Sequence, residues 1–135
     1  MGNSMKTVLI LDDEEFIRQS FADFFEDRLW RTLPAKSAEE ALSLLETASP
    51  HAAIVDIRLP GMNGDTFIRQ AAIKKPEMVF IVCTGSTGYI LPDDLVILPT
   101  VCNHIFSKPV IKMAEIESRF LRMMSTHETT ENQND

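Results

Sequence analysis

Residues 52–64 read Ala-Ala-Ile-Val-Asp-Ile-Arg-Leu-Pro-Gly-Met-Asn-Gly. The first four residues are apolar, and a short apolar run that ends at turn residues is typical of a buried strand. Asp56 follows this run directly. The Pro-Gly and Asn-Gly pairs predict a loop that leads into a helix, which Pro76 ends. These residues therefore predict a strand with an acid at its end, then a loop and a helix.

Three other apolar runs also end at a side chain that carries chemistry. These are Asp12 and Asp13 after residues 8–11, Thr84 after residues 79–83, and Lys108 after residues 104–107. If the runs are parallel strands of one sheet, the side chains meet at its carboxyl edge, where open α/β sheets place their sites. Three carboxylates, a hydroxyl and an ammonium at that edge predict a site for a divalent cation and a phosphoryl group.

Segments with helical periodicity separate the apolar runs. Glu14 and Glu15 open the first of them, in a turn where the helix dipole favours acids. Residues 37–40 read Ser-Ala-Glu-Glu, a capping box that opens a second helix, and residues 31–35 form a weak strand between the two. A last helix places apolar residues on one face from Met113 onwards. This alternation predicts an α/β fold with a parallel sheet.

Residues 86–103 do not fit the alternation. Pro92 and Pro99 lie in this segment, and a proline inside a helix costs about 3 kcal/mol. We therefore expect a doubly wound sheet of five strands in which the fourth helix is short or irregular.

Composition limits the class of protein. The chain has 135 residues, which is enough for one domain with a core, and 44% of them are hydrophobic. Its net charge of -7 argues against nucleic-acid binding by this domain, since phosphate recognition needs clustered Lys and Arg. No run is long enough to span a bilayer and the start has no signal peptide, so we expect a cytoplasmic protein without a membrane partner.

The two ends differ from the rest of the chain. We expect residues 1–5 to be an N-terminal extension or a remnant of cloning, and residues 6–125 to form the domain. Residues 126–135 are polar and lack apolar periodicity, which predicts a disordered tail.

Four short motifs give the chain a resemblance to a known family. They are Leu-Asp-Asp-Glu at 11–14, Val-Asp-Ile-Arg-Leu-Pro-Gly-Met-Asn-Gly at 55–64, Thr-Gly-Ser at 84–86 and Lys-Pro at 108–109. Each is common alone, but all four in this order, each after an apolar run, are specific. The chain resembles the receiver domain of two-component response regulators over about residues 5–125. The family implies a flavodoxin-like parallel sheet in the strand order 2-1-3-4-5.

The resemblance also implies roles for individual residues. Asp56 would accept a phosphoryl group from the phosphohistidine of a histidine kinase or phosphotransfer protein. Asp13 and Asp56 would bind Mg²⁺ directly, Asp12 would bind it through water, and the backbone carbonyl of Arg58 would complete the protein ligands.

Two further residues would act on the phosphoryl group. Lys108 would supply a positive charge to its oxygens and Thr84 would donate a hydrogen bond. The domain would be a signalling switch that phosphorylates and dephosphorylates itself, not a separate enzyme, and it would act on a downstream protein target.

Three other functions compete with this interpretation. A haloacid-dehalogenase-like phosphatase also uses Asp, Thr and Lys around Mg²⁺. It has a second Asp two residues after the nucleophile on its first strand, where this chain has Glu14 and Glu15, and it needs room for a cap, which these 135 residues do not provide. A pseudo-receiver usually lacks an acid or the lysine, and here all are present. A flavodoxin-like phosphate loop would follow the first strand, whereas residues 84–88 follow the fourth.

The chain departs from the family next to its lysine. Receivers usually carry Tyr or Phe three residues before that lysine, and here the residue is Ile105, while Phe106 takes the neighbouring, core-facing position. We therefore expect another element to respond to phosphorylation, with residues 85–103 and Tyr89 as the candidates.

Overall fold

The computed structural model describes residues 5–110 and 112–133. Its centre is a five-stranded parallel sheet in the order β2-β1-β3-β4-β5, which is the order that the family resemblance implies. The strands are β1 (Thr7–Leu11), β2 (Arg31–Ala35), β3 (Ala52–Val55), β4 (Val79–Thr84) and β5 (Phe106–Ser107). Because all five strands run in the same direction, their carboxyl ends lie at one edge of the sheet.

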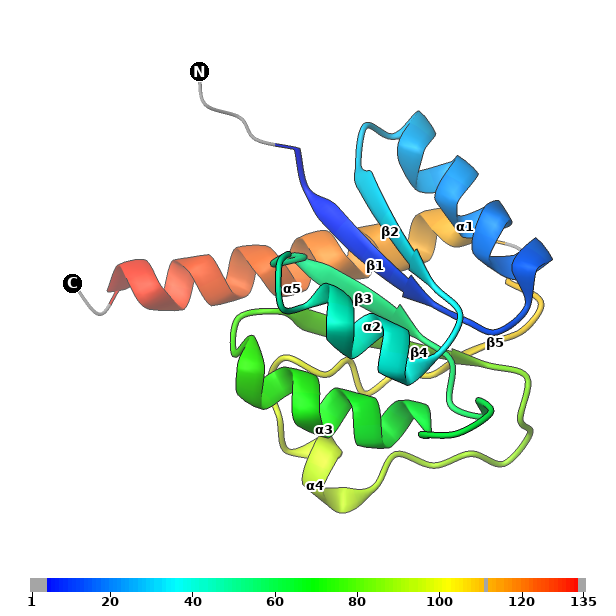
Figure 1. The fold of residues 1–135 in the computed structure, drawn as a ribbon. Coiled ribbons are helices and arrows are strands. Elements are labelled where there is room, and N and C mark those ends of the chain that lie inside the picture. Colours follow the sequence, from blue (N-terminus) through cyan, green and yellow to red (C-terminus); the bar gives the residue numbers. More distant parts are fainter. Residues whose placement is uncertain (1–4, 111, 134–135) are drawn as a thin grey trace.

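Helices cover both faces of the sheet. In Figure 1, α2 and α3 lie in front of the strands and α5 lies behind them. The helices are α1 (Glu15–Asp27), α2 (Ala38–Leu44), α3 (Gly64–Lys74), α4 (Asp93–Val96) and α5 (Met113–Gln133). Ser37 caps α2, since its hydroxyl accepts a hydrogen bond of 3.1 Å from the Glu40 N–H. The predicted doubly wound architecture is confirmed.

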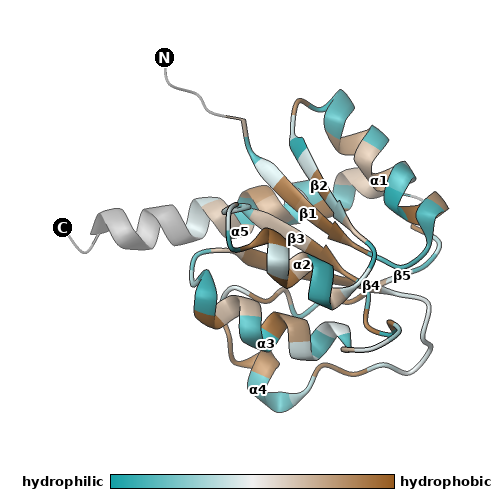
Figure 2. Ribbon diagram, in the orientation of Figure 1, coloured by the Kyte–Doolittle hydropathy of each residue, from teal (hydrophilic) through white to brown (hydrophobic). Residues whose placement is uncertain are grey.

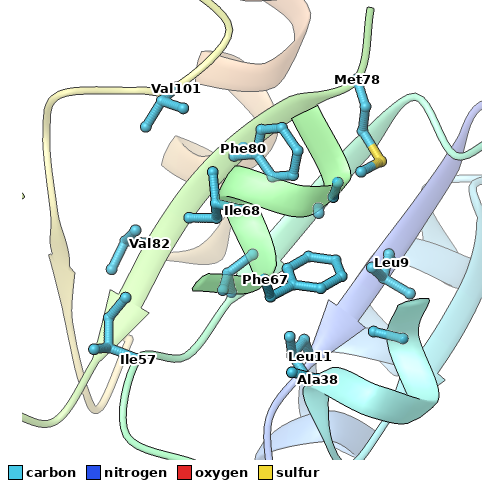
Figure 3. Packing of buried hydrophobic residues seen from close by; sticks show 14 of the residues in the cluster. Leu9, Leu11, Ala38, Ile57, Phe67, Ile68, Met78, Phe80, Val82 and Val101 are labelled. Carbon is cyan, nitrogen blue, oxygen red and sulfur yellow. The ribbon is translucent and has the colours of Figure 1, made fainter. Parts of the chain in front are cut away.

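The core has two parts, one on each side of the sheet. Successive residues of a strand point to opposite faces, so Leu9 and Leu11 pack on the side of α2 and α3 while Val8 and Ile10 pack on the side of α1 and α5. Figure 2 shows hydrophobic colour concentrated on β1, β3 and β4, and hydrophilic colour on the outer helix surfaces. Figure 3 shows the part of the core on the side of α2 and α3, in which the rings of Phe67 and Phe80 meet edge to face. Each such buried side chain stabilises the fold by about 1.5–3 kcal/mol.

The end of α1 is tied to α5 at the amino edge of the sheet. Leu29 takes a left-handed conformation with φ 68°, and the Trp30 N–H then bonds the Phe25 carbonyl, which closes the helix in a Schellman motif. The Trp30 indole donates a hydrogen bond of 2.9 Å to Glu117, which also pairs with Arg28. Trp30 precedes β2, so it lies at the edge opposite the predicted site.

The fourth helix is a single turn, as Pro92 and Pro99 predict. The chain around it is irregular, and α4 is held to α3 by an ion pair of 2.6 Å between Arg69 and Asp94. Ile105 packs on the α3 side of the sheet, and Phe106 is buried on the α5 side. The predicted placement of Phe106 in the core is confirmed.

The C-terminal end of the chain differs from its prediction. α5 extends to Gln133, so residues 126–133 are helical in the structure, where the sequence predicts a disordered tail. Extending an existing helix costs far less than starting one, and a rule based on apolar periodicity does not detect such an extension. Residues 1–4 and 134–135 lie outside the described residues. Within the described ranges, no helix combines the length and the apolar content required to cross a membrane.

Candidate functional site

The carboxyl edge of the sheet brings the predicted residues together. Leu11 and Val55 pair in register on β1 and β3, so Asp12 and Asp56 leave neighbouring strands side by side. The Asp56 N–H donates to the Leu11 carbonyl at 2.9 Å, which extends this pairing by one residue. Both residues are buried, with relative exposures of 3% for Asp12 and 5% for Asp56. Parallel register therefore places two acids from distant parts of the sequence at one point.

Thr84 and Lys108 approach the same point from β4 and β5. Thr84 pairs in register with Ser107, and the Lys108 N–H donates to the Thr84 carbonyl at 3.0 Å. The Thr84 hydroxyl accepts a hydrogen bond of 3.2 Å from the Ser86 N–H. A hydroxyl donates as well as accepts, so Thr84 keeps a donor for an anion. The Lys108–Pro109 peptide bond is cis.

The Lys108 ammonium lies between three carboxylates. Its Nζ is 2.7 Å from Asp12 Oδ2, 2.9 Å from Asp56 Oδ2 and 3.1 Å from Glu14 Oε2. The lysine side chain is only 10% exposed. An ammonium has three N–H donors, so all three are engaged by acids from β1, β3 and the start of α1.

The electrostatics of the site keep the lysine charged. Burial lowers the pKa of the Lys108 ammonium, but its hydrogen bonds to Asp12 and Asp56 outweigh that effect and raise the pKa above its ordinary value. Burial raises the pKa of the Asp12 carboxyl, and the hydrogen bonds from Lys108 and from the Glu14 N–H only partly oppose it. Lys108 is thus a fixed positive charge at neutral pH.

Three carboxylates are arranged so that they could hold a metal ion. One oxygen each from Asp12, Asp13 and Asp56 lies within 4.8 Å of the other two. Asp13 is exposed whereas the other two acids are buried, so the cluster is open to solvent on one side. Hard divalent cations such as Mg²⁺ prefer oxygen ligands and keep several waters, and this open donor set fits that requirement.

A depression of about 490 Å³ lies at this edge of the sheet. It is lined by Asp13, Glu14, Asp56, Arg58, Thr84, Gly85, Ser86, Thr87 and Lys108. The sequence predicted Asp13, Asp56, Arg58, Thr84 and Lys108 for the site, and all of these line the depression. Asp12 is buried and is paired with Lys108, which lines the depression. The structure therefore brings every predicted site residue to one place.

Sequence reasoning missed the part that Glu14 plays. It assigned Glu14 to the first turn of a helix, where an acid interacts with the dipole. In the structure Glu14 is the N-cap of α1 but makes no side-chain cap, and its carboxylate contacts Lys108 instead. Its position directly after Asp12 and Asp13 is the only signal that could have indicated this.

A second missed contact holds the loop after Asp56. Glu39, in the first turn of α2, accepts a hydrogen bond of 3.1 Å from the Met62 N–H. Gly61, beside it, has a positive φ of 81°, a conformation that glycine adopts without steric cost. The sequence predicts a glycine turn here, but no local pattern indicates its partner on α2.

Comparison with known proteins points in one direction. Residues 8–120 match the family described as "Response regulator receiver domain". The hydrogenase transcriptional regulatory protein HoxA of Cupriavidus necator is 32% identical over 87 residues, which cover 64% of this chain and 18% of HoxA. The transcriptional regulatory protein CssR of Bacillus subtilis is 28% identical over 105 residues, or 78% of this chain and 45% of CssR. The chain therefore spans less than half the length of these relatives.

Solved structures agree with this match. A CheY-like receiver domain from Methanospirillum hungatei superposes with a TM-score of 0.78 at 26% identity, over 93% of this chain and 99% of that one. The response regulator TrrA of Thermotoga maritima, solved in complex with Mg(2+)-BeF, gives 0.74 at 21% identity, over 88% and 99% of the two chains. At 21% identity, the likeness to TrrA supports the assignment of the fold alone.

Proposed function

Because the chain belongs to the response regulator receiver family, the phosphoacceptors of two-component signalling, we propose that its acceptor is Asp56. One observation carries the proposal. Asp56 Oδ2 lies 2.9 Å from the Lys108 ammonium, while Oδ1 accepts a hydrogen bond of 2.8 Å from the Ile57 N–H. The carboxylate is thus fixed in orientation at the floor of an open depression, beside the positive charge that an incoming phosphoryl group requires.

The other acids suit a supporting role. We propose that Asp13 and Asp56 bind Mg²⁺ directly, that Asp12 binds it through water, and that the Arg58 carbonyl completes the protein ligands. The oxygen cluster of the three acids supports this, and so does the Mg(2+)-BeF complex of TrrA. When bound, the ion would neutralise the crowded carboxylates and the phosphoryl oxygens.

The chain's own residues supply the rest of the chemistry. An Asp56 oxygen would attack the phosphorus of a phosphohistidine, a P–O bond would form, and the bond to the leaving imidazole nitrogen would break. Lys108 would move an N–H from Asp56 to a phosphoryl oxygen, and the Thr84 hydroxyl would donate to another. A loose phosphoryl-transfer transition state needs this positioning and charge, with no general base.

The partners follow from the chemistry. The donor would be a histidine kinase or a phosphotransfer protein, and part of the sensor kinase CckA of Brucella abortus is itself 31% identical to this chain over 81 residues. We propose that the domain only phosphorylates and dephosphorylates itself and passes its state to a downstream protein target.

A mass measurement tests the proposal. The protein is incubated with Mg²⁺ and a small phosphodonor such as acetyl phosphate, and its intact mass is followed with time. We expect the mass of one phosphoryl group to appear, and to disappear when the acyl phosphate hydrolyses. A chain that never gains this mass, with Mg²⁺ and the donor in excess, would contradict the assignment.

Metal binding should depend more on Asp13 than on Asp12. We expect Asp13→Asn, which removes a direct ligand, to weaken Mg²⁺ binding by more than about 100-fold, and Asp12→Asn by about 10-fold, as for a residue that acts through water. Calorimetry is the suitable measurement. Trp30, the one tryptophan, is at the opposite edge of the sheet, so its fluorescence does not report on this site. Asp23→Asn, on the exposed side of α1, is the control. Equal losses in the two site variants would refute the assignment of direct and water-mediated ligands.

Residues 85–103 are proposed as the element that responds to phosphorylation. They follow Thr84 directly, and the only regular element among them is α4. The Tyr89 hydroxyl is buried and has no hydrogen-bond partner among the described residues. An unpaired buried hydroxyl costs about 1–3 kcal/mol, so a state that gives it a partner gains stability.

Hydrogen exchange tests this response. With Mg²⁺ and beryllofluoride, a phosphoryl mimic, we expect the largest change in amide protection within residues 85–103. Asp56→Asn with the same additives should show no change there. If protection changes only in the loops that carry Asp13 and Asp56, this segment is not the responding element.

A further inference from the structure

Glu14 differs from the other acids around Lys108. It lies at the rim, where its side chain is 61% exposed, whereas the side chains of Asp12 and Asp56 are 4% and 6% exposed. It is also outside the oxygen cluster that fits a metal ion. The one hydrogen bond that its carboxylate makes to a described side chain is the contact of 3.1 Å with the Lys108 ammonium.

This position matters once the acceptor is loaded. The contacts of Lys108 with Asp12 and Asp56 join it to residues of the proposed metal and phosphoryl site, so they are rearranged when that site fills. The contact with Glu14 has no such reason to break. A carboxylate that still holds the ammonium competes with the phosphoryl oxygens for the same N–H donors, and its charge repels them.

We propose that Glu14 is a positioning residue that limits the phosphorylated state by holding Lys108 on the α1 side of the depression. The inference rests on the function proposed for Asp56 and Lys108. It predicts opposite effects on two ligands when the Glu14 carboxylate is removed. A phosphoryl-like anion gains Lys108 and binds more tightly, whereas Mg²⁺ alone loses a nearby negative charge and binds more weakly.

Three variants separate contact from charge. Glu14→Gln removes the charge and weakens the contact. Glu14→Asp keeps the charge on a side chain one methylene shorter, which no longer reaches Lys108. Glu15→Gln removes the same charge one residue further on, from an exposed side chain in the first turn of α1.

The experiment measures beryllofluoride affinity at saturating Mg²⁺ by ¹⁹F NMR, and Mg²⁺ affinity by calorimetry. We expect Glu14→Gln to bind beryllofluoride about three- to tenfold more tightly, an effect sized for a partly exposed charge pair and reduced by added salt. Glu14→Asp should show most of that gain and Glu15→Gln little of it. The ¹⁵N resonance of the Lys108 ammonium in the free protein should shift in both Glu14 variants.

Each other outcome has a clear meaning. An unchanged beryllofluoride affinity in a folded Glu14→Gln protein overturns the proposal. Equal gains in Glu14→Gln and Glu15→Gln overturn it as well, because they show a general field and no positioning of Lys108. If the wild-type protein itself fails to bind beryllofluoride with Mg²⁺, the proposed function fails first.

Discussion

Replacing Asp56 with asparagine is expected to abolish phosphorylation completely. The amide has nearly the shape of the carboxylate, and its oxygen can still accept the hydrogen bond that the Ile57 N–H gives to Asp56 Oδ1. It has no negatively charged oxygen to attack phosphorus, so the acyl phosphate cannot form. The variant should therefore fold like wild type and gain no phosphoryl mass when incubated with acetyl phosphate and Mg²⁺.

The control for this experiment is another Asp→Asn change outside the site. Asp23 is exposed on α1, where it accepts a hydrogen bond of 2.8 Å from Gln19. Asp23→Asn should take up the label as wild type does, which shows that loss of one carboxylate elsewhere is without effect. Labelling of Asp56→Asn to the wild-type level would mean that another residue is the acceptor, and Asp13 would then be tested next.

The sequence predicts the site well because parallel sheets follow a simple rule. Asp12, Asp56 and Thr84 each end or follow an apolar strand, and parallel strands bring all such positions to one edge. No knowledge of side-chain packing is needed for this step. The same applies to α4, since prolines at 92 and 99 leave room for only one helical turn between them.

Contacts between distant elements are the part that the sequence could not predict. Glu14 obeys a local rule for acids at helix starts, yet Lys108, 94 residues later, attracts its carboxylate instead. Glu39 similarly looks like an ordinary first-turn acid of α2 and in fact holds the loop after Asp56. In both cases the local pattern is satisfied, so it gives no sign that a tertiary partner has replaced the local one.

Gly64 shows how a correct local prediction can have a different cause. The Asn-Gly pair at 63–64 helps to predict a loop that leads into α3. The structure shows a close approach, because the Gly64 N–H donates to the Ile57 carbonyl at 2.9 Å and the glycine backbone lies against the Asp56 carbonyl. Gly64 has no positive φ. The glycine is required here by the space available, and this space is next to the proposed acceptor.

Gly64→Ala is therefore expected to be the most damaging single change in the fold of the site. An added Cβ would lie far inside van der Waals contact with the Asp56 backbone oxygen, and only 2.9 Å from Val55 Cγ1. The main obstacle is backbone, so no side-chain rotation relieves it. We expect the free energy of unfolding to fall by about 3 kcal/mol or more, the upper end of the range for overpacking, and Mg²⁺ binding to weaken because Asp56 must move.

Gly85→Ala is the matched comparison from the same site. A Cβ there would lie 3.9 Å from Lys108 Cδ, which is ordinary contact, and Gly85 also has no positive φ. Alanine reduces the freedom of the unfolded chain, so this variant should keep its stability within about 1 kcal/mol. Urea denaturation of both variants measures the difference. A Gly64→Ala protein as stable as Gly85→Ala would show that the β3–α3 turn can move away from Asp56, and the fixed geometry proposed for the acceptor would then be wrong.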